Sequence, residues 1–165
     1  MGTTSYAIAL GSNRLHGRFG GPTNVVRAAI ERLGSVIAAS RIRATPALGP
    51  AGRSFANAVV ILESGLAPDE LLDELKSIER EFGRRGGQRW GPRVLDLDII
   101  LWSDGPWGGP GPIIPHPEFR KRAFVLEPLA EIAPGWRDPL TGATVAQLLA
   151  RLRRPRVVDR APWRP

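Results

Sequence analysis

The order in which strand-like and helix-like segments follow one another constrains the fold of this chain more than any other feature of its sequence. Four short apolar runs have the length and composition of β-strands, and each ends at a glycine, serine or proline. They lie at residues 6–10, 35–45, 55–63 and 94–102. The segments that separate them decide how these strands can be connected.

Two amphipathic helices are expected between the strands. The first is capped by Thr23 or Asn24 and ends at Gly34, with apolar residues at helical spacing. The second begins at Pro68 and ends at Gly83. The order βαββαβ is typical of the ferredoxin-like α+β fold. We therefore expect an antiparallel four-stranded sheet with both helices on one face, followed by additional C-terminal elements.

The length of 165 residues suits one domain. We expect it over residues 1–152, with a short helix near residues 145–152, and a basic, poorly ordered tail over residues 153–165. The chain has no cysteine, which excludes disulfides and thiolate metal ligands. Its first residues lack the basic start of a signal peptide, and its apolar runs are too short to span a membrane. We expect a cytoplasmic protein without a membrane partner.

The chain carries a net charge of +7, and 21 of its 23 basic residues are arginine. Arginine binds phosphate groups with two parallel hydrogen bonds, so a polyanionic ligand is one interpretation. A genome rich in arginine codons is another. Charge alone does not distinguish a nucleotide from a nucleic acid.

Two aspartates lie within the last apolar run, "VLDLDIILW". In a strand, Asp96 and Asp98 would face one side, while Leu95, Leu97, Ile99 and Leu101 would face the other. Carboxylates about 6–7 Å apart along a strand can bind one Mg²⁺, or can bracket two ions. A solvated strand face is the ordinary alternative for such a pair.

The neighbouring sequence favours the metal hypothesis. Aspartate is depleted in strands, and four arginines precede this pair at positions 84, 85, 89 and 93. Cations around two carboxylates suit a phosphate chain bridged by metal, as in phosphoryl or pyrophosphoryl transfer. The chain lacks the P-loop and protein-kinase motifs, so another class of phosphotransferase is indicated.

At this point the sequence resembles a known family. The segments "ALGSN", "TPALGP", "FANAVV", "RWGPRVLDLDII" and "IPHPEFRKRAFVLEPLAEIAP" follow one another as in the 6-hydroxymethyl-7,8-dihydropterin pyrophosphokinases of folate biosynthesis. The resemblance runs from about Tyr6 to Trp136. It implies a ferredoxin-like fold and transfer of pyrophosphate from ATP to the pterin hydroxymethyl group, with release of AMP.

The resemblance also implies roles for individual residues. Asp96 and Asp98 match the ligands of two Mg²⁺ ions, and with Arg84 and Arg93 they form the expected catalytic set. The expected ATP-binding residues are Glu79, Arg84, Trp90, Arg93, Ile99, His116 and Arg122. The expected pterin-binding residues are Thr45, Pro46, Leu48, Phe55, Asn57, Trp90 and Phe124.

The pterin set is physically coherent. A flat heterocycle packs well between two aromatic rings, which Phe55 and Phe124 can supply. Asn57 shares a strand face with Phe55 and offers both a donor and an acceptor to the edge of the pterin. Taken singly, each of these residues has an ordinary structural interpretation, such as a core phenylalanine or an edge-strand amide. Their spacing within the family pattern favours the functional one.

Two alternatives stay open at this point. A basic ferredoxin-like sheet is also the framework of RNA-recognition modules, but those modules need an aromatic pattern that this chain lacks. An inactive relative that binds pterin is the second alternative, because Gly86 stands where the family often has a loop arginine. We expect an active monomer that binds ATP and 6-hydroxymethyl-7,8-dihydropterin, with no nucleic-acid partner.

Overall fold

A computed structural model describes residues 2–45, 54–83 and 94–155 of the chain. Within them an antiparallel sheet is formed by β1 (Thr4–Ser12), β2 (Val36–Ala39), β3 (Arg43–Thr45), β4 (Phe55–Ser64) and β5 (Asp96–Trp102). The helices are α1 (Pro22–Leu33), α2 (Pro68–Gly83), α3 (Ala123–Ile132) and α4 (Val145–Arg153), and a 3₁₀ turn, η1 (Phe119–Lys121), precedes α3. None of the helices in these residues is long and apolar enough to cross a membrane.

The sheet has the topology predicted from the sequence. Its strands lie in the order β2-β4-β1-β5, and β3 also pairs with β4. Every pairing is antiparallel. The ferredoxin-like α+β prediction is therefore confirmed, with β1 and β4 at the centre of the sheet.

The second predicted strand is divided into β2 and β3 by Ser40. The Ser40 N–H donates a hydrogen bond to the Val59 carbonyl at 2.9 Å, and the Val59 N–H donates to Ser40 Oγ at 3.0 Å. Ala39 pairs with Val60 and Arg43 pairs with Asn57. Between these two pairs the chain of β2 and β3 advances by four residues, while β4 advances by three. The buried serine hydroxyl takes the place of a ladder carbonyl, which explains the interruption.

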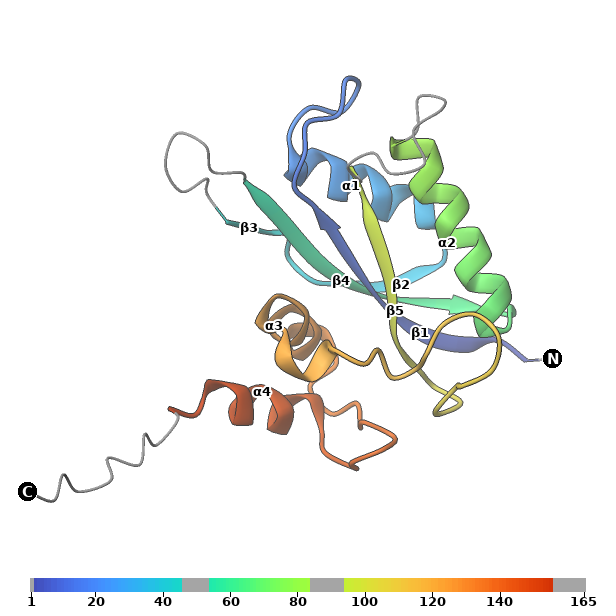
Figure 1. Cartoon of the computed structure of the whole chain (residues 1–165), viewed down its shortest axis with the longest axis vertical. Helices are drawn as coiled ribbons and strands as arrows, with labels where there is room; N and C mark the ends of the chain where they lie inside the picture. The colour runs from blue at the N-terminus through green and yellow to red at the C-terminus, as the bar shows by residue number, and fades with distance from the viewer. Residues whose placement is uncertain (1, 46–53, 84–93, 156–165) are drawn as a thin grey trace, which may run out of the picture.

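Helices cover both faces of the sheet, and each face has its own apolar core (Figure 1). The two predicted helices, α1 and α2, pack on one face against side chains such as Tyr6, Ile8 and Leu10. On the other face, α3 and α4 pack against Ala7, Val59 and their neighbours. The additional C-terminal elements therefore form a second helical layer.

Helix α1 begins earlier than its sequence suggests. Its N-cap is Gly21 and Pro22 is its first residue, so the predicted caps Thr23 and Asn24 lie inside the first turn. The fixed φ of proline suits this first helical position, which explains the difference. The predicted end is confirmed, because Gly34 is the C-cap with a φ of 66°.

A β-bulge near the end of β5 overturns one predicted side-chain direction. Ile8 pairs with Ile99 while Ala7 pairs with Leu101, so Ile100 is an extra residue in β5. Leu95, Leu97 and Ile99 pack toward α1 and α2 as expected. Leu101 instead packs toward α3 and α4, together with Ile100. Strict alternation fails there because a bulge reverses the face of the residues that follow it.

A fully buried carboxylate holds the segment that leads into α3. Asp138 accepts hydrogen bonds from Arg120 Nε at 2.6 Å and from Arg120 Nη2 at 2.8 Å. The Leu140 N–H and the Thr141 hydroxyl donate two further hydrogen bonds to it. Burial alone would raise the pKa of this carboxyl group, but the hydrogen bonds from Arg120, Leu140 and Thr141 outweigh burial and lower the pKa to about 2.

Asp138→Asn is therefore expected to destabilise the fold by about 3 kcal/mol at pH 7, because it leaves the Arg120 charge without its partner. The folded pKa lies below the ordinary value of 3.8, so the stability from this carboxylate is complete above about pH 4 and is lost as the pH falls toward 2. Urea unfolding of both proteins at several pH values measures the difference. Glu81→Gln is the control, since it breaks the exposed Arg32–Glu81 pair and should change little. An equal loss of unfolding free energy in Asp138→Asn and Glu81→Gln would contradict the prediction.

Candidate functional site

A cavity of about 690 Å³ opens where β1, β4 and β5 meet the first turn of α3. Seven residues that the sequence analysis selected lie on its walls: Thr45, Phe55, Asn57, Asp96, Asp98, Arg122 and Phe124. They come from four different elements and from the residue just before α3. The fold thus gathers both predicted groups, the carboxylates and the aromatic side chains, around one space.

The two aspartates lie on the sheet face that is covered by α3. Asp96 pairs with Gly11 and Asp98 pairs with Ala9 across the β1–β5 ladder. Because directly opposed residues share a face, both carboxylates stand beside positions with little or no side chain. This leaves space next to them for a ligand. Asp96 is exposed and Asp98 is half-buried.

Carboxylate oxygens are ligands that suit Mg²⁺. Within the described part of the chain, no group of three or more histidine, aspartate or glutamate side chains is placed to hold a metal ion. Asp96 and Asp98 would therefore supply part of a coordination shell. Mg²⁺ commonly takes its remaining ligands from water and from substrate phosphates, so the donor set fits an ion that binds together with a nucleotide.

His116 is held close to the aspartate strand. Its backbone N–H donates to the Ile100 carbonyl of β5 at 3.0 Å, and its ring Nδ1 accepts a hydrogen bond from the Glu118 backbone N–H at 3.1 Å. Burial lowers the pKa of His116; the Arg122 charge lowers it further, while Asp98 and Glu118 act in the opposite direction. With Nδ1 accepting, the neutral ring carries its proton on Nε2. His116 can thus donate a hydrogen bond from Nε2 at neutral pH.

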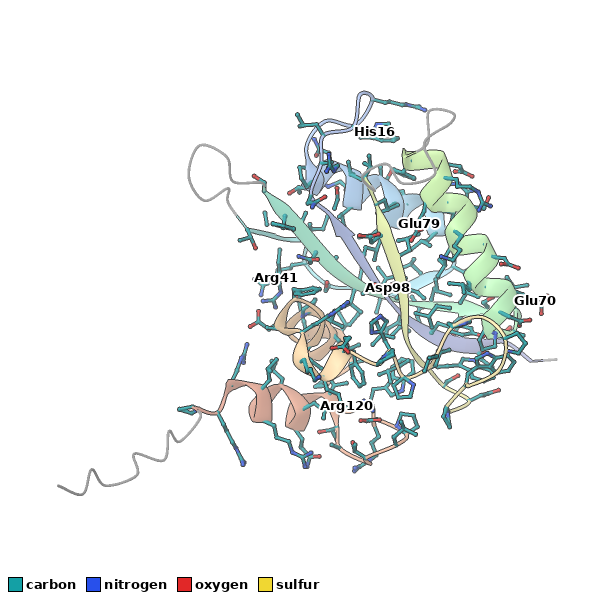
Figure 2. The ribbon with its side chains drawn as sticks, viewed as in Figure 1. His16, Arg41, Glu70, Glu79, Asp98 and Arg120 are labelled. Atoms are coloured by element: carbon teal, nitrogen blue, oxygen red, sulfur yellow. The ribbon has the colours of Figure 1, made fainter. Side chains whose placement is uncertain are left out.

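Glu79 links α2 to the strand that carries the aspartates. Its Oε1 accepts a hydrogen bond from the Leu97 N–H, between Asp96 and Asp98, at 2.8 Å. Figure 2 shows Glu79 reaching from α2 toward β5. The side chain of Ile99, another predicted ATP-binding residue, is only 3% exposed and belongs to the core. A nucleotide contact from Ile99 would therefore have to come from its backbone.

Two phenylalanines line the cavity while remaining unusually open to solvent. Phe55, at the start of β4, is 46% exposed, and Phe124, in the first turn of α3, is 51% exposed. The Arg122 guanidinium carbon lies 5.6 Å from the centre of the Phe124 ring, a cation–π distance. Aromatic rings left exposed in a cavity are well placed to pack against a flat ligand.

Asn57 lies beside the phenylalanines and is opposed by a glycine. Gly11 pairs with Asn57 across the β1–β4 ladder. A Cβ atom at Gly11 would lie 3.2 Å from Asn57 Oδ1, which is a tight contact. The missing side chain at Gly11 therefore leaves room for the amide. Sequence reasoning did not assign a role to Gly11, because its place opposite Asn57 and Asp96 follows only from the strand register.

Several predicted site residues lie outside the described residues. They are Pro46, Leu48, Arg84, Trp90 and Arg93. His16, which the sequence analysis did not place in the site, organises its own loop. Its Nδ1 accepts hydrogen bonds from the Arg18 and Phe19 N–H groups, and its ring lies 4.8 Å from that of Phe19.

Comparison with known proteins identifies a family. A sequence model described as "7,8-dihydro-6-hydroxymethylpterin-pyrophosphokinase (HPPK)" matches residues 7–134. A 2-amino-4-hydroxy-6-hydroxymethyldihydropteridine pyrophosphokinase from Pseudomonas aeruginosa is 42% identical over 87% of this chain and 88% of the relative. One of the same description from Methylorubrum extorquens is 37% identical over 88% of this chain and 91% of the relative.

Other matches are longer proteins. A Synechocystis relative of the same description is 46% identical, but the match covers 64% of this chain and only 54% of the relative. The crystal structure of wild-type Plasmodium falciparum HPPK-DHPS superposes with a TM-score of 0.66 over 91% of this chain and 45% of that protein. At 12% sequence identity, this second likeness supports the fold alone.

Proposed function

Because this chain belongs to the 7,8-dihydro-6-hydroxymethylpterin-pyrophosphokinase family, we propose that it transfers pyrophosphate from ATP to the hydroxymethyl group of 6-hydroxymethyl-7,8-dihydropterin in folate biosynthesis. One observation carries the proposal beyond family membership. A single cavity is lined both by two carboxylates suited to Mg²⁺ and by two exposed aromatic rings beside an amide. A phosphate donor and a flat heterocycle can therefore meet within it.

The pterin would occupy the part of the cavity between Phe55 and Phe124. Stacking on both faces would orient the ring, and the Asn57 amide would donate to and accept from its polar edge. Thr45, opposite Phe55 in the β3–β4 ladder, closes the same end of the cavity. Pro46, Leu48 and Trp90 are proposed to complete this subsite.

The triphosphate of ATP would lie toward the aspartates. Asp96 and Asp98 would hold two Mg²⁺ ions, which would neutralise phosphate charge and polarise the transferring group. Arg122 and the Nε2–H of neutral His116 would donate to phosphate oxygens. Arg84 and Arg93 are proposed to do the same, and Glu79, Trp90 and the Ile99 backbone to hold the rest of the nucleotide.

The reaction is a displacement at phosphorus. The pterin hydroxymethyl oxygen would attack the β-phosphorus of ATP, and the bond from that phosphorus to the oxygen bridging to the α-phosphate would break. AMP would leave with the bridging oxygen, and the hydroxyl proton would be released. The chain's contribution is to hold the two substrates in line and to place positive charge and hydrogen-bond donors around the transferring group.

AMP formation from ATP and 6-hydroxymethyl-7,8-dihydropterin tests the proposal. We expect AMP only when both substrates and Mg²⁺ are present, and we expect excess chelator to abolish it. Pterin binding without AMP from folded protein would instead identify an inactive relative. Salt-sensitive RNA binding without turnover would favour the nucleic-acid alternative.

We also propose that the enzyme acts as a monomer. Use of ATP as the donor supports a cytoplasmic location. Light scattering during gel filtration, with and without both substrates, measures the oligomeric state. A dimer under either condition would contradict the monomer proposal.

A further inference from the structure

A cluster of ion pairs joins β3 to α3 outside the cavity. Arg43, on β3, places Nη1 3.3 Å from Glu127 Oε2 and Nη2 3.3 Å from Glu131 Oε2. The Arg41 N–H donates to Glu131 Oε1 at 3.0 Å, and Arg153 Nη2 lies 3.2 Å from Glu127 Oε1. Arg41 lies beside α3 in Figure 2. One guanidinium thus spans two carboxylates on consecutive turns of the helix.

The same two elements carry opposite walls of the proposed pterin subsite. On β3, Arg43 is two residues from Thr45, so both face the same side of the sheet. On α3, Phe124, Glu127 and Glu131 recur at intervals of three and four residues, so they lie along one stripe of the helix. The ion pairs therefore connect the walls about one helical turn from the Phe124 ring.

Helix α3 packs against β4, whereas the ion pairs of Arg43 join it to β3. Strand β3 has three residues and pairs only with β4 among the described strands. Helix α3 is held to the sheet by buried apolar side chains such as Val125, Leu126 and Leu129. Apolar burial is non-directional, whereas charged hydrogen bonds depend on geometry. The position of α3 along the β3 edge should therefore depend on Arg43.

Charge repulsion strengthens this dependence. Glu127 and Glu131 are four residues apart on α3, where two like charges repel. A hydrogen bond from the Arg41 backbone N–H, and the Arg43 side chain after it, lower the pKa of Glu131, so this glutamate is ionised at neutral pH. Arg43 lies between the two carboxylates and, with Arg41 and Arg153, offsets their charge. Without it, Glu127 would keep Arg153 and Glu131 would keep Arg41, but the guanidinium that bridges both carboxylates to β3 would be lost.

We infer that Arg43 is a positioning residue for the heterocycle: by bridging Glu127 and Glu131, it sets the separation between Phe124 and the Thr45–Phe55 wall. This inference rests on the proposed function. Arg43 does not line the cavity, so it acts through the residues that do. The partly exposed pairs should contribute little to overall stability. The main effect of losing them should be on pterin affinity.

Arg43→Met tests the inference, because methionine keeps an unbranched apolar stem and removes the guanidinium. We expect the KM and Kd for the pterin to rise about tenfold, since the stacked geometry depends on the spacing of the walls. The KM for ATP and the urea midpoint should stay close to those of the native chain. Arg43→Lys keeps the charge without the two-pronged geometry, so it should recover part of the pterin affinity.

Arg32→Met is the matched control, because it removes an exposed arginine–glutamate bridge between α1 and α2, on the opposite face of the sheet. It should leave both KM values unchanged. If Arg43→Met changes both KM values equally, or leaves the pterin values unchanged, Arg43 has no positioning role. If Arg43→Met does not fold, the double variant Glu127→Gln with Glu131→Gln decides by the same measurements. Failure of the native chain to form AMP would overturn the proposed function itself, which is a separate result.

Discussion

Asp98→Asn is expected to reduce the rate of AMP formation by about 10³-fold or more, because it removes a charged ligand from the proposed metal site. Asparagine has nearly the same size and keeps one oxygen, so the half-buried position should stay filled. It lacks the negative charge that would hold Mg²⁺ against the triphosphate. Single-turnover rates over a range of Mg²⁺ concentrations measure the loss, and excess Mg²⁺ should restore little of it.

Asp104→Asn is the control for this change. Asp104 is exposed and lies just beyond the end of β5, so replacing it with asparagine removes the same charge near the same strand. It should retain the native rate. Asp96→Asn should behave like Asp98→Asn, and the double variant should lose little more than the more damaging single change, because groups that act as a unit are not additive. Native rates in a folded Asp98→Asn protein would mean that the two aspartates form only a solvated strand face.

Much of this architecture could be predicted because local patterns coincide with the tertiary arrangement. Helix α2 begins at Pro68 and ends at Gly83 as its sequence indicates, and its buried residues Leu71, Leu75 and Ile78 have the expected spacing. The strand order followed from the βαββαβ pattern. The two aspartates were also identified from sequence, because charged residues inside an apolar strand need a reason to be there.

Helix α3 was not predicted, although its sequence is strongly apolar. It contains Pro128, which ordinarily argues against a helix interior, and it lacks an acidic residue in its first turn and a side-chain cap. Packing of Val125, Leu126 and Leu129 against the sheet supplies what the local signals do not. Tertiary burial here outweighs local propensity.

The long-range contacts around the cavity were beyond sequence reasoning for a different reason. Arg43 and Glu127 are 84 positions apart, and nothing local to either residue indicates that they meet. The bulge at Ile100 is likewise a property of the β1–β5 pairing and not of β5 alone. Sequence patterns assign residues to elements, whereas the spacing between elements depends on long-range packing.

Asn57→Leu is expected to reduce kcat/KM for the pterin by about 100-fold while leaving the KM for ATP nearly unchanged, because the polar edge of the ligand would lose its hydrogen-bonding partner. Leucine has a similar shape, so the sheet should tolerate it at this half-buried position. Isothermal titration with the pterin measures the affinity, and steady-state kinetics with each substrate varied in turn separates the two subsites.

Two further variants give the Asn57 prediction a graded test. Asn57→Asp keeps an acceptor but loses the amide donor. The difference in pterin affinity between Asn57→Asp and Asn57→Leu therefore shows whether the acceptor or the donor of the amide contributes more. Gly11→Ala leaves the amide in place but adds a Cβ atom 3.2 Å from its Oδ1, so it should cost less than either change at Asn57 itself. Equal losses of affinity for the pterin and for ATP in Asn57→Leu would indicate a disturbed β-sheet. A loss of pterin affinity alone that is largest for Asn57→Leu, smaller for Asn57→Asp and smallest for Gly11→Ala would indicate that the amide contacts the ligand. It would also indicate that the glycine opposite the amide provides the room for it.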